Sequence, residues 1–203
     1  MFPLNYSTVF DPLLQDVRAG AVELSGMKPG DRALDVCCGT GDQVFHYTRQ
    51  GVIAAGIDIN PNIIKLAERT KSKLGLTNVS FQVANAANLP FDDNFFDYAS
   101  ISLALHEIER TTRDKIIFEM KRVVKTKGGL IFVDYQVPLP KNFYGYLFKV
   151  GEFIATRGDH YKNFRDFLAQ GGLAQLLPKN QLGVEKRSYL KRGTIAIVTT
   201  LNV

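Results

Sequence analysis

Short apolar runs alternate with helical segments along most of this 203-residue chain, and this alternation constrains the fold more than any other feature. Apolar runs of four to six residues that end at a glycine or a carboxylate are typical of buried strands. Such runs predict strands at residues 33–36, 52–57, 79–83, 98–103 and 130–133. Strands separated by helices favour parallel crossover connections and a sheet covered on both faces.

The last part of the chain breaks this alternation. Residues 182–190 and 194–201 form two strand-like runs joined by Lys191-Arg192-Gly193, which predicts an antiparallel hairpin. The predicted fold class is therefore α/β. We expect a Rossmann-like seven-stranded sheet with five parallel strands, a C-terminal antiparallel hairpin and helices on both faces.

Helical periodicity predicts the remaining elements. Residues 10–24 form one helix, and a helix at 112–125 is expected to end at Gly128-Gly129. Residues 136–178 contain helical pieces rich in aromatic and basic side chains, which we interpret as an insertion before the hairpin. With no linker-like stretch or repeat, residues 1–203 are predicted to form a single domain.

Bulk properties exclude several classes of protein. No apolar run approaches the ~20 residues of a membrane span, and the first residues lack a secretory signal, so we expect a cytoplasmic protein. The only cysteines, Cys37 and Cys38, are adjacent, which argues against an intrachain disulfide framework. Together with three scattered histidines, they do not match a zinc-ligand spacing, and no metal site is predicted.

The formal charge of +5 is concentrated near the C-terminus. Residues 1–140 hold 15 Lys and Arg against 16 Asp and Glu, whereas residues 141–203 hold 10 against 4. The basic part either serves solubility or favours anionic substrates and surfaces. No basic run is interleaved with aromatics as in a nucleic-acid module, so no nucleic-acid partner is predicted.

The segment LDVCCGTGD at residues 34–42 carries the most chemistry. Gly39 and Gly41 follow the first predicted strand and allow the backbone to approach a ligand where the next helix begins. Asp58 ends the second predicted strand, where an acidic side chain can accept hydrogen bonds from ribose hydroxyls. Taken alone, a Gly-x-Gly turn is weak evidence, but its spacing to Asp35 and Asp58 predicts a nucleoside-containing ligand.

Two ligand classes suit such a turn. A dinucleotide favours G-x-G-x-x-G, but Val44 occupies the third glycine position, and the acidic Asp35 is unfavourable beside a diphosphate. Asp35 suits a ligand with a cationic amino group. S-adenosylmethionine carries such a group as well as a cationic sulfur, and it is the predicted cofactor.

The sequence resembles the class I S-adenosylmethionine-dependent methyltransferases, and in particular the branch of ubiquinone/menaquinone-biosynthesis C-methyltransferases. The resemblance covers residues 5–135, and four motifs carry it: LDVCCGTGD at 34–42, GIDIN at 56–60, NAANLPFDDNFFD at 85–97 and GGLIFVD at 128–134. The sequence departs from the family pattern at three positions. Cys37 stands where many members have glycine, Asn85 replaces an aspartate, and Lys127 replaces a proline.

The resemblance implies roles for individual residues. Asp35 would hold the methionine amino group, Asp58 the ribose, and Ile59 would lie against the adenine. Asn85 and Ala86 would contact the adenine edge, and an N-terminal helix within residues 1–30 would cover the cofactor. The predicted cofactor-binding set is Tyr6, Asp35, Cys37, Cys38, Gly39, Thr40, Gly41, Asp58, Ile59, Asn85, Ala86 and Ser102.

Candidates for the methyl-acceptor side come from two strand ends and the insertion. His106 and Glu107 follow the fourth strand, where Glu107 could orient the histidine or act as a base; the alternative is a solvated pair at a helix start. Tyr135 ends the fifth strand and either points a hydroxyl at the acceptor or packs in the core. His160 lies in the 136–178 insertion, which is expected to roof the acceptor site, and it is either catalytic or structural.

The predicted function is methyl transfer to a small, hydrophobic or lipid-like acceptor. The apolar stripe within residues 143–154, flanked by lysines, suits core packing, an acceptor-site wall or peripheral contact with a membrane. Two alternatives remain: a nicotinamide-dependent oxidoreductase, and a catalytically silent protein that retains cofactor binding. The oligomeric state is not predicted.

Overall fold

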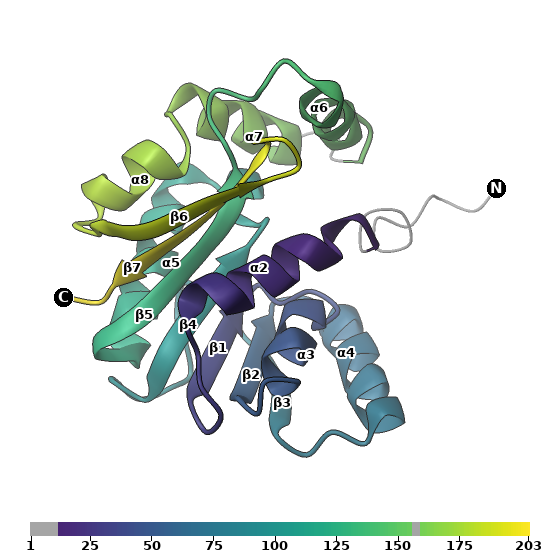
Figure 1. Cartoon of the computed structure of the whole chain (residues 1–203), viewed down its shortest axis with the longest axis vertical. Coiled ribbons are helices and arrows are strands. Elements are labelled where there is room, and N and C mark those ends of the chain that lie inside the picture. The colour runs from purple at the N-terminus through teal and green to yellow at the C-terminus, as the bar shows by residue number, and fades with distance from the viewer. Residues whose placement is uncertain (1–11, 156–158) are drawn as a thin grey trace.

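A seven-stranded sheet with the strand order β3-β2-β1-β4-β5-β7-β6 organises the molecule (Figure 1). The computed structural model describes residues 12–155 and 159–203. The first five strands pair in parallel and β7 pairs antiparallel with both β5 and β6, as predicted. The strands are β1 (Arg32–Val36), β2 (Ile53–Asp58), β3 (Val79–Val83), β4 (Phe96–Ser102), β5 (Val124–Tyr135), β6 (Val184–Leu190) and β7 (Ile195–Leu201).

Helices cover both faces of the sheet. The described helices are the short 3-10 helices η1 (Pro12–Leu14) and η2 (Leu105–Glu107), together with α2 (Gln15–Ser25), α3 (Asp42–Thr48), α4 (Pro61–Leu74), α5 (Arg110–Val123), α6 (Phe143–Ala155), α7 (Asp159–Ala169) and α8 (Leu173–Lys179). Adjacent residues of β1 point to opposite faces: Ala33 belongs to a core cluster that includes residues of α2, α3 and α4, and Leu34 to one that includes residues of α5 and α8.

Local sequence signals explain where α4 begins and ends. The Asn60 side chain accepts a hydrogen bond from the Asn62 backbone at 3.0 Å, and Pro61 occupies the first turn, where its missing N–H costs nothing. Gly75 ends the helix in the left-handed conformation. Because α4 follows directly from β2, these signals also fix the position of Asp58 at the end of that strand.

The prediction that Gly128-Gly129 ends the helix expected at residues 112–125 was wrong. α5 ends at Val123, and both glycines lie inside β5, which is longer at its start than the sequence predicted. A Cβ atom on Gly129 would lie 2.5 Å from the Tyr98 ring of the paired strand β4. These glycines therefore allow close packing within the sheet instead of breaking a helix.

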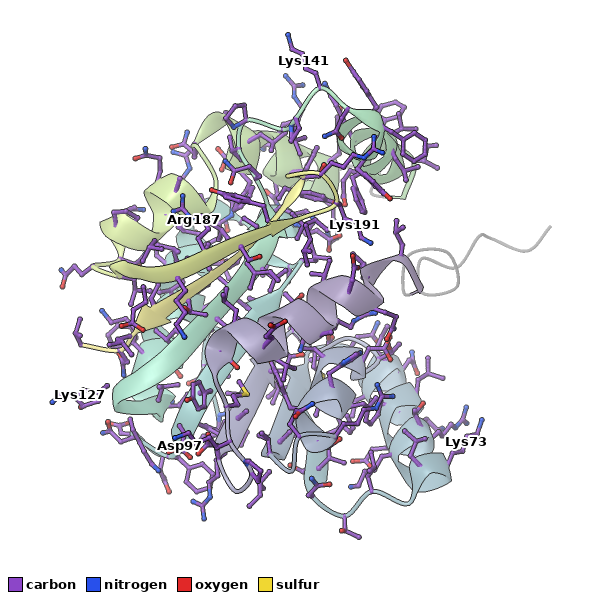
Figure 2. The ribbon with its side chains drawn as sticks, viewed as in Figure 1. Lys73, Asp97, Lys127, Lys141, Arg187 and Lys191 are labelled. Carbon is purple, nitrogen blue, oxygen red and sulfur yellow. The ribbon has the colours of Figure 1, made fainter. Side chains whose placement is uncertain are left out.

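The carboxyl ends of the parallel strands meet at one edge of the sheet. In Figure 2, Asp97 and Lys127 mark the opposite edge, where β4 and β5 begin. At the carboxyl edge, α6 and α7 cover the end of β5 through Phe148 and Phe164, which pack in one cluster with Tyr135. No helix within the described ranges is long and apolar enough to cross a membrane.

Candidate functional site

A cavity of about 380 Å³ opens at the carboxyl ends of β1 and β4. These two strands are neighbours in the sheet, but β2 and β3 come between them in the chain and lie on the other side of β1. The connections therefore diverge at this point, which is where open α/β sheets bind ligands. The cavity is lined by Leu14, Val17, Arg18, Asp35, Cys37, Cys38, Gly39, Thr40, Asp42, Gln43, Asp58, Ile63, Leu66, Ser102, Leu103, Ala104 and Glu107.

Asp35 is a buried carboxyl group in the wall of this cavity. Its side chain is 2% exposed and accepts a 2.5 Å hydrogen bond from the Ser100 hydroxyl on β4. Burial raises the pKa of Asp35 to about 7, although the hydrogen bond from Ser100 opposes this shift. A buried carboxylate of this kind is stabilised by a ligand that brings a positive charge.

Asp58 holds the glycine turn in place. One carboxylate oxygen accepts a hydrogen bond from the Gly39 backbone N–H at 3.1 Å, and the other accepts one from the Asn60 N–H at 2.9 Å. The turn itself requires unusual backbone conformations, with φ values of +58° at Cys37 and +54° at Gly39. Asp58 therefore lines the cavity and connects the ends of β1 and β2.

Gly41 lies in the predicted turn but does not line the cavity. It has a φ of +86° and precedes α3, and a Cβ atom at this position would lie 2.5 Å from the Phe81 ring. Its role in the structure is to bring the start of α3 close to β3. The prediction that Gly41 contacts the ligand remains a prediction.

The N-terminal helical region covers one side of the cavity. Leu14, Val17 and Arg18 line it, and the guanidinium of Arg18 lies 3.4 Å from the Asp42 carboxylate at the start of α3. These three residues were not in the predicted cofactor-binding set, and cover of the cofactor by the N-terminal helix remains a prediction. Tyr6, which was predicted to bind the cofactor, lies outside the described residues.

The residues expected to contact an adenine ring do not line the cavity. Ile59 is 71% exposed, and neither it nor Asn85 or Ala86 lines the cavity. The Asn85 side chain instead accepts a hydrogen bond from the Ala87 backbone at 2.9 Å. Adenine contact by these three residues remains a prediction.

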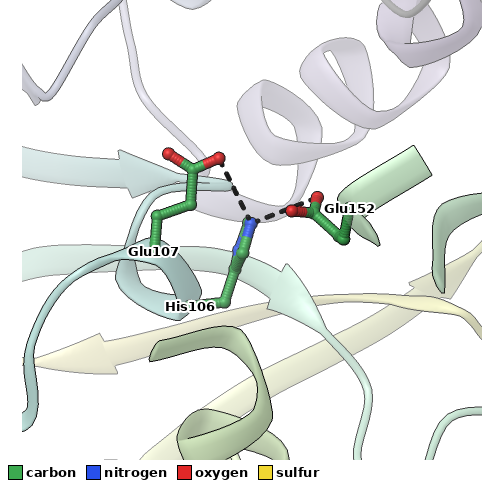
Figure 3. A group of neighbouring side chains, drawn as sticks. All are labelled: His106, Glu107 and Glu152. Carbon is green, nitrogen blue, oxygen red and sulfur yellow. Dashed lines mark ion pairs between the residues drawn. The ribbon is translucent and has the colours of Figure 1, made fainter. Parts of the chain in front are cut away.

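His106 and Glu107 bring a buried cluster of ionisable groups to the cavity. The His106 ring is fully buried, and its Nδ1 atom lies 2.7 Å from Oδ1 of Asp134 at the end of β5. As Figure 3 shows, its other nitrogen, Nε2, faces two glutamates. Nε2 lies 3.4 Å from Oε1 of Glu152 on α6 and 3.8 Å from Oε1 of Glu107.

The electrostatics of this cluster favour a positive charge between the carboxylates. Burial by itself would lower the pKa of His106, but Asp134 and Glu152 raise it to about 10. Burial also raises the pKa of Glu107, whose side chain is 33% exposed and lines the cavity. The alternative of a solvated His-Glu pair is therefore wrong for His106.

The other two acceptor-side candidates lie in the same region. Tyr135 is buried and donates a 2.7 Å hydrogen bond to Oε1 of Glu152, so its hydroxyl contacts the cluster. The His160 side chain on α7 is 61% exposed, with Nδ1 3.8 Å from Oε2 of Glu107. Thus the adjacent pair His106 and Glu107 comes together in space with two candidates that are distant in sequence, Tyr135 and His160.

Two features of the cluster, Glu152 and the pairing of Asp134 with His106, were not predicted from the sequence. The buried face of α6 could have indicated Glu152, because it lies one helical turn after Phe148, and each of these side chains is only 2% exposed. A carboxylate on the apolar face of a helix is unusual without a partner nearby. The sequence does not show which element that face meets.

A model of the ubiE/COQ5 methyltransferase family matches residues 15–202. The chain belongs to this family. The chain is also similar to two curated ubiquinone/menaquinone biosynthesis C-methyltransferases named UbiE. The protein from Yersinia pestis bv. Antiqua (strain Antiqua) is 35% identical and that from Edwardsiella ictaluri (strain 93-146) is 32% identical, each over 154 residues.

Each match covers 70% of this chain and 60% of the UbiE protein, so the shared region spans less than two thirds of those relatives. Solved structures support the same fold over a longer range. A SAM-dependent methyltransferase from Aquifex aeolicus superposes with a TM-score of 0.73 and 19% identity, and the superposition covers 100% of both chains. At this identity, the likeness supports the fold of this ubiE/COQ5 family member.

Proposed function

We propose that this protein binds S-adenosylmethionine in the cavity beside β1 and β4, and transfers its methyl group to a ring carbon of a hydrophobic, quinol-like acceptor. One observation carries the proposal: within the family-matched region, Asp35, the Cys37–Thr40 turn and Asp58 line a single cavity. The methyl group on the cationic sulfur is the electrophile that this cofactor supplies.

The chemistry of the cavity wall fits the cofactor. The Asp35 carboxylate, desolvated as it is, would pair with the methionine amino group, and Asp58 would accept hydrogen bonds from the ribose hydroxyls. Leu14 and Val17 provide apolar surface on the α2 side, and such a wall excludes water from a reactive sulfonium. Ser102 lines the cavity from the end of β4, next to the acceptor side.

The acceptor side supports a substrate with an ionisable hydroxyl. Glu107 is the described member of the His106 cluster that lines the cavity, and burial raises its pKa, which makes it a stronger base than an exposed carboxylate. In the proposed reaction, Glu107 would take the hydroxyl proton, and the adjacent ring carbon would accept the methyl group that the cofactor supplies, with the carbon–sulfur bonding pair remaining on the thioether. The proton on the methylated carbon would then pass to solvent, and Glu107 would return its proton to the oxygen, which restores the aromatic hydroxyl.

A hydrophobic acceptor is favoured by two observations. The relatives are named for ubiquinone and menaquinone biosynthesis. In addition, α6 places Glu152 against the cluster while its other face exposes five large apolar side chains: Phe143, Tyr146, Val150, Phe153 and Ile154. An exposed apolar surface next to the site suits a lipid-like acceptor.

The nicotinamide alternative differs in its ligand. A dinucleotide needs close approach of a diphosphate to the helix start, but Val44 is fully buried on α3 and Asp35 would face the diphosphate region. Calorimetry with S-adenosylhomocysteine and with NAD separates these ligands. Binding of NAD without binding of S-adenosylhomocysteine would contradict the proposal.

The decisive experiment is a methyl-transfer assay with methyl-labelled S-adenosylmethionine and a panel of acceptors. We expect label in the ring of reduced, prenylated quinols and little label in aliphatic alcohols. Glu107→Gln should lower kcat at least roughly tenfold while S-adenosylhomocysteine affinity changes little. Glu68→Gln, on the exposed side of α4, is the control. Cofactor binding with no transfer to any acceptor would support a catalytically silent protein instead.

A further inference from the structure

Nε2 of His106 and the carboxylates of Glu107 and Glu152 present three donor atoms to a common point. One ligand atom from each residue lies within 4.8 Å of the other two. His106 and Glu152 are buried, whereas Glu107 is half-buried at the cavity. Figure 3 shows the three side chains converging from η2 and α6.

The separations suit a bound cation. Metal–ligand bonds of about 2.0–2.2 Å place neighbouring donor atoms roughly 3.0–3.6 Å apart in tetrahedral or octahedral sites. Nε2 of His106 lies 3.4 Å from Oε1 of Glu152 and 3.8 Å from Oε1 of Glu107. Rotation of the Glu107 side chain, which is 33% exposed, would close the remaining gap.

A second observation concerns the other nitrogen of the same ring. Nδ1 lies 2.7 Å from Oδ1 of Asp134, and both side chains are fully buried. A metal-binding histidine commonly donates its second ring N–H to a carboxylate, which fixes the tautomer and aims the free nitrogen at the metal. Asp134 therefore directs Nε2 toward the two glutamates. Glu107 comes from η2 and Glu152 from α6.

We propose that His106, Glu107 and Glu152 bind a divalent first-row transition ion at the edge of the cofactor cavity. Three protein ligands leave coordination positions open, as in catalytic metal sites. One nitrogen and two carboxylate oxygens suit ions such as Mn²⁺, Co²⁺ or Zn²⁺. The open positions would accept a hydroxyl oxygen of the acceptor. This catalytic use rests on the proposed methyl transfer, whereas ion binding by the three residues is independent of it.

The test is direct ion binding to chelator-treated full-length protein, without cofactor or acceptor. Electron paramagnetic resonance of free Mn²⁺ measures how many ions the protein removes from solution, and we expect one per chain. Co²⁺ should give visible absorption bands from nitrogen and oxygen ligands. The Glu107→Gln variant should reduce affinity at least about tenfold, and Asp134→Asn should reduce it by about 10–100-fold through loss of histidine orientation.

Glu68→Gln, which removes a surface carboxylate on α4, should leave binding unchanged. Circular dichroism checks that each variant folds. Glu107→Gln should disturb the fold less than Asp134→Asn, because the Glu107 side chain is half-buried and the Asp134 side chain is fully buried. The absence of a bound ion in the wild-type protein, or equal binding by wild type and Glu107→Gln, would overturn the proposal. Ion binding without methyl transfer would instead leave the site standing and remove the proposed function.

Discussion

At the scale of single residues, the wall of the proposed cofactor cavity contains two carboxylates with different environments. Asp35 is buried beside Ser100 and has a raised pKa, whereas Asp58 accepts hydrogen bonds from two backbone N–H groups. The first is stabilised by an incoming positive charge, and the second is already fixed before a ligand binds. Substitutions at these positions should therefore affect binding in different ways.

Replacing Asp58 with alanine should weaken S-adenosylhomocysteine binding by about 1–3 kcal/mol, because it removes both the ribose acceptor and the hydrogen bond that holds Gly39. Isothermal titration calorimetry measures this loss. Asp93→Ala, which removes an exposed carboxylate that pairs with Arg122, is the control. An affinity equal to that of the wild type would show that Asp58 does not contact the ligand.

The affinity for S-adenosylhomocysteine should depend on pH through Asp35. Its pKa of about 7 means that the free protein is protonated at Asp35 below this pH, and pairing with the amino group requires the charged form. Affinity should thus fall by up to about tenfold per pH unit below pH 7. In Asp35→Asn the affinity should be lower and nearly independent of pH between 5 and 8.

The same substitution should raise the stability of the ligand-free protein. A carboxyl group whose folded pKa lies above the unfolded value destabilises the fold progressively as pH rises from about 4 to 7. Asp35→Asn removes this penalty, so its melting temperature should exceed that of the wild type at pH 8 and match it near pH 4. A lower melting temperature at pH 8 would indicate that the carboxylate is stabilised within the free protein.

At the scale of elements, the glycine turn forms part of the cavity wall and also positions α3. Gly39 lines the cavity, whereas Gly41 brings α3 against Phe81 of β3. Gly75, at the end of α4, also has a positive φ, but a Cβ atom there would meet no packed neighbour within 4 Å among the described residues. A comparison of Gly41 with Gly75 therefore distinguishes the cost of a left-handed backbone from the cost of a steric clash.

Gly41→Ala should destabilise the protein by about 2–4 kcal/mol, because the left-handed backbone costs about 1 kcal/mol and contact with Phe81 adds about 1–3 kcal/mol. Gly75→Ala should cost only about 1 kcal/mol from the backbone. Urea denaturation measures both. Equal losses in the two variants would show that Phe81 moves freely to accommodate the added methyl group.

At the scale of the whole molecule, α6 presents an apolar face next to basic groups. Phe143, Tyr146, Val150, Phe153 and Ile154 are 54–68% exposed and follow helical spacing, whereas Phe148 and Glu152 face the protein. Lys141, two residues before α6, and Lys149, within α6, are both exposed, and Figure 2 shows Lys141 projecting outward near α6. This combination suits the surface of a bilayer that contains anionic lipid.

We therefore expect the protein to cosediment with vesicles that contain anionic phospholipid, and to bind less as salt increases. The double substitution Phe143→Ser and Phe153→Ser should reduce the bound fraction severalfold. Phe118→Ser on α5 is a matched control, because Phe118 is 67% exposed outside this face. Equal binding by all three proteins would exclude α6 as the contact surface.

The sequence alone determined the order of the strands and helices, the C-terminal hairpin and the Asp35–Gly39–Asp58 arrangement. Periodicity and turn residues encode these features locally, and parallel strands place their carboxyl ends at one edge. The prediction that Gly128-Gly129 ends α5 was wrong, because Gly129 instead allows close packing against Tyr98 of the paired strand β4. Only the tertiary structure brings His106 next to Asp134 and Glu152, which lie 28 and 46 positions later in the chain. Sheet pairing and helix packing bring these residues together, and no local sequence pattern records those contacts.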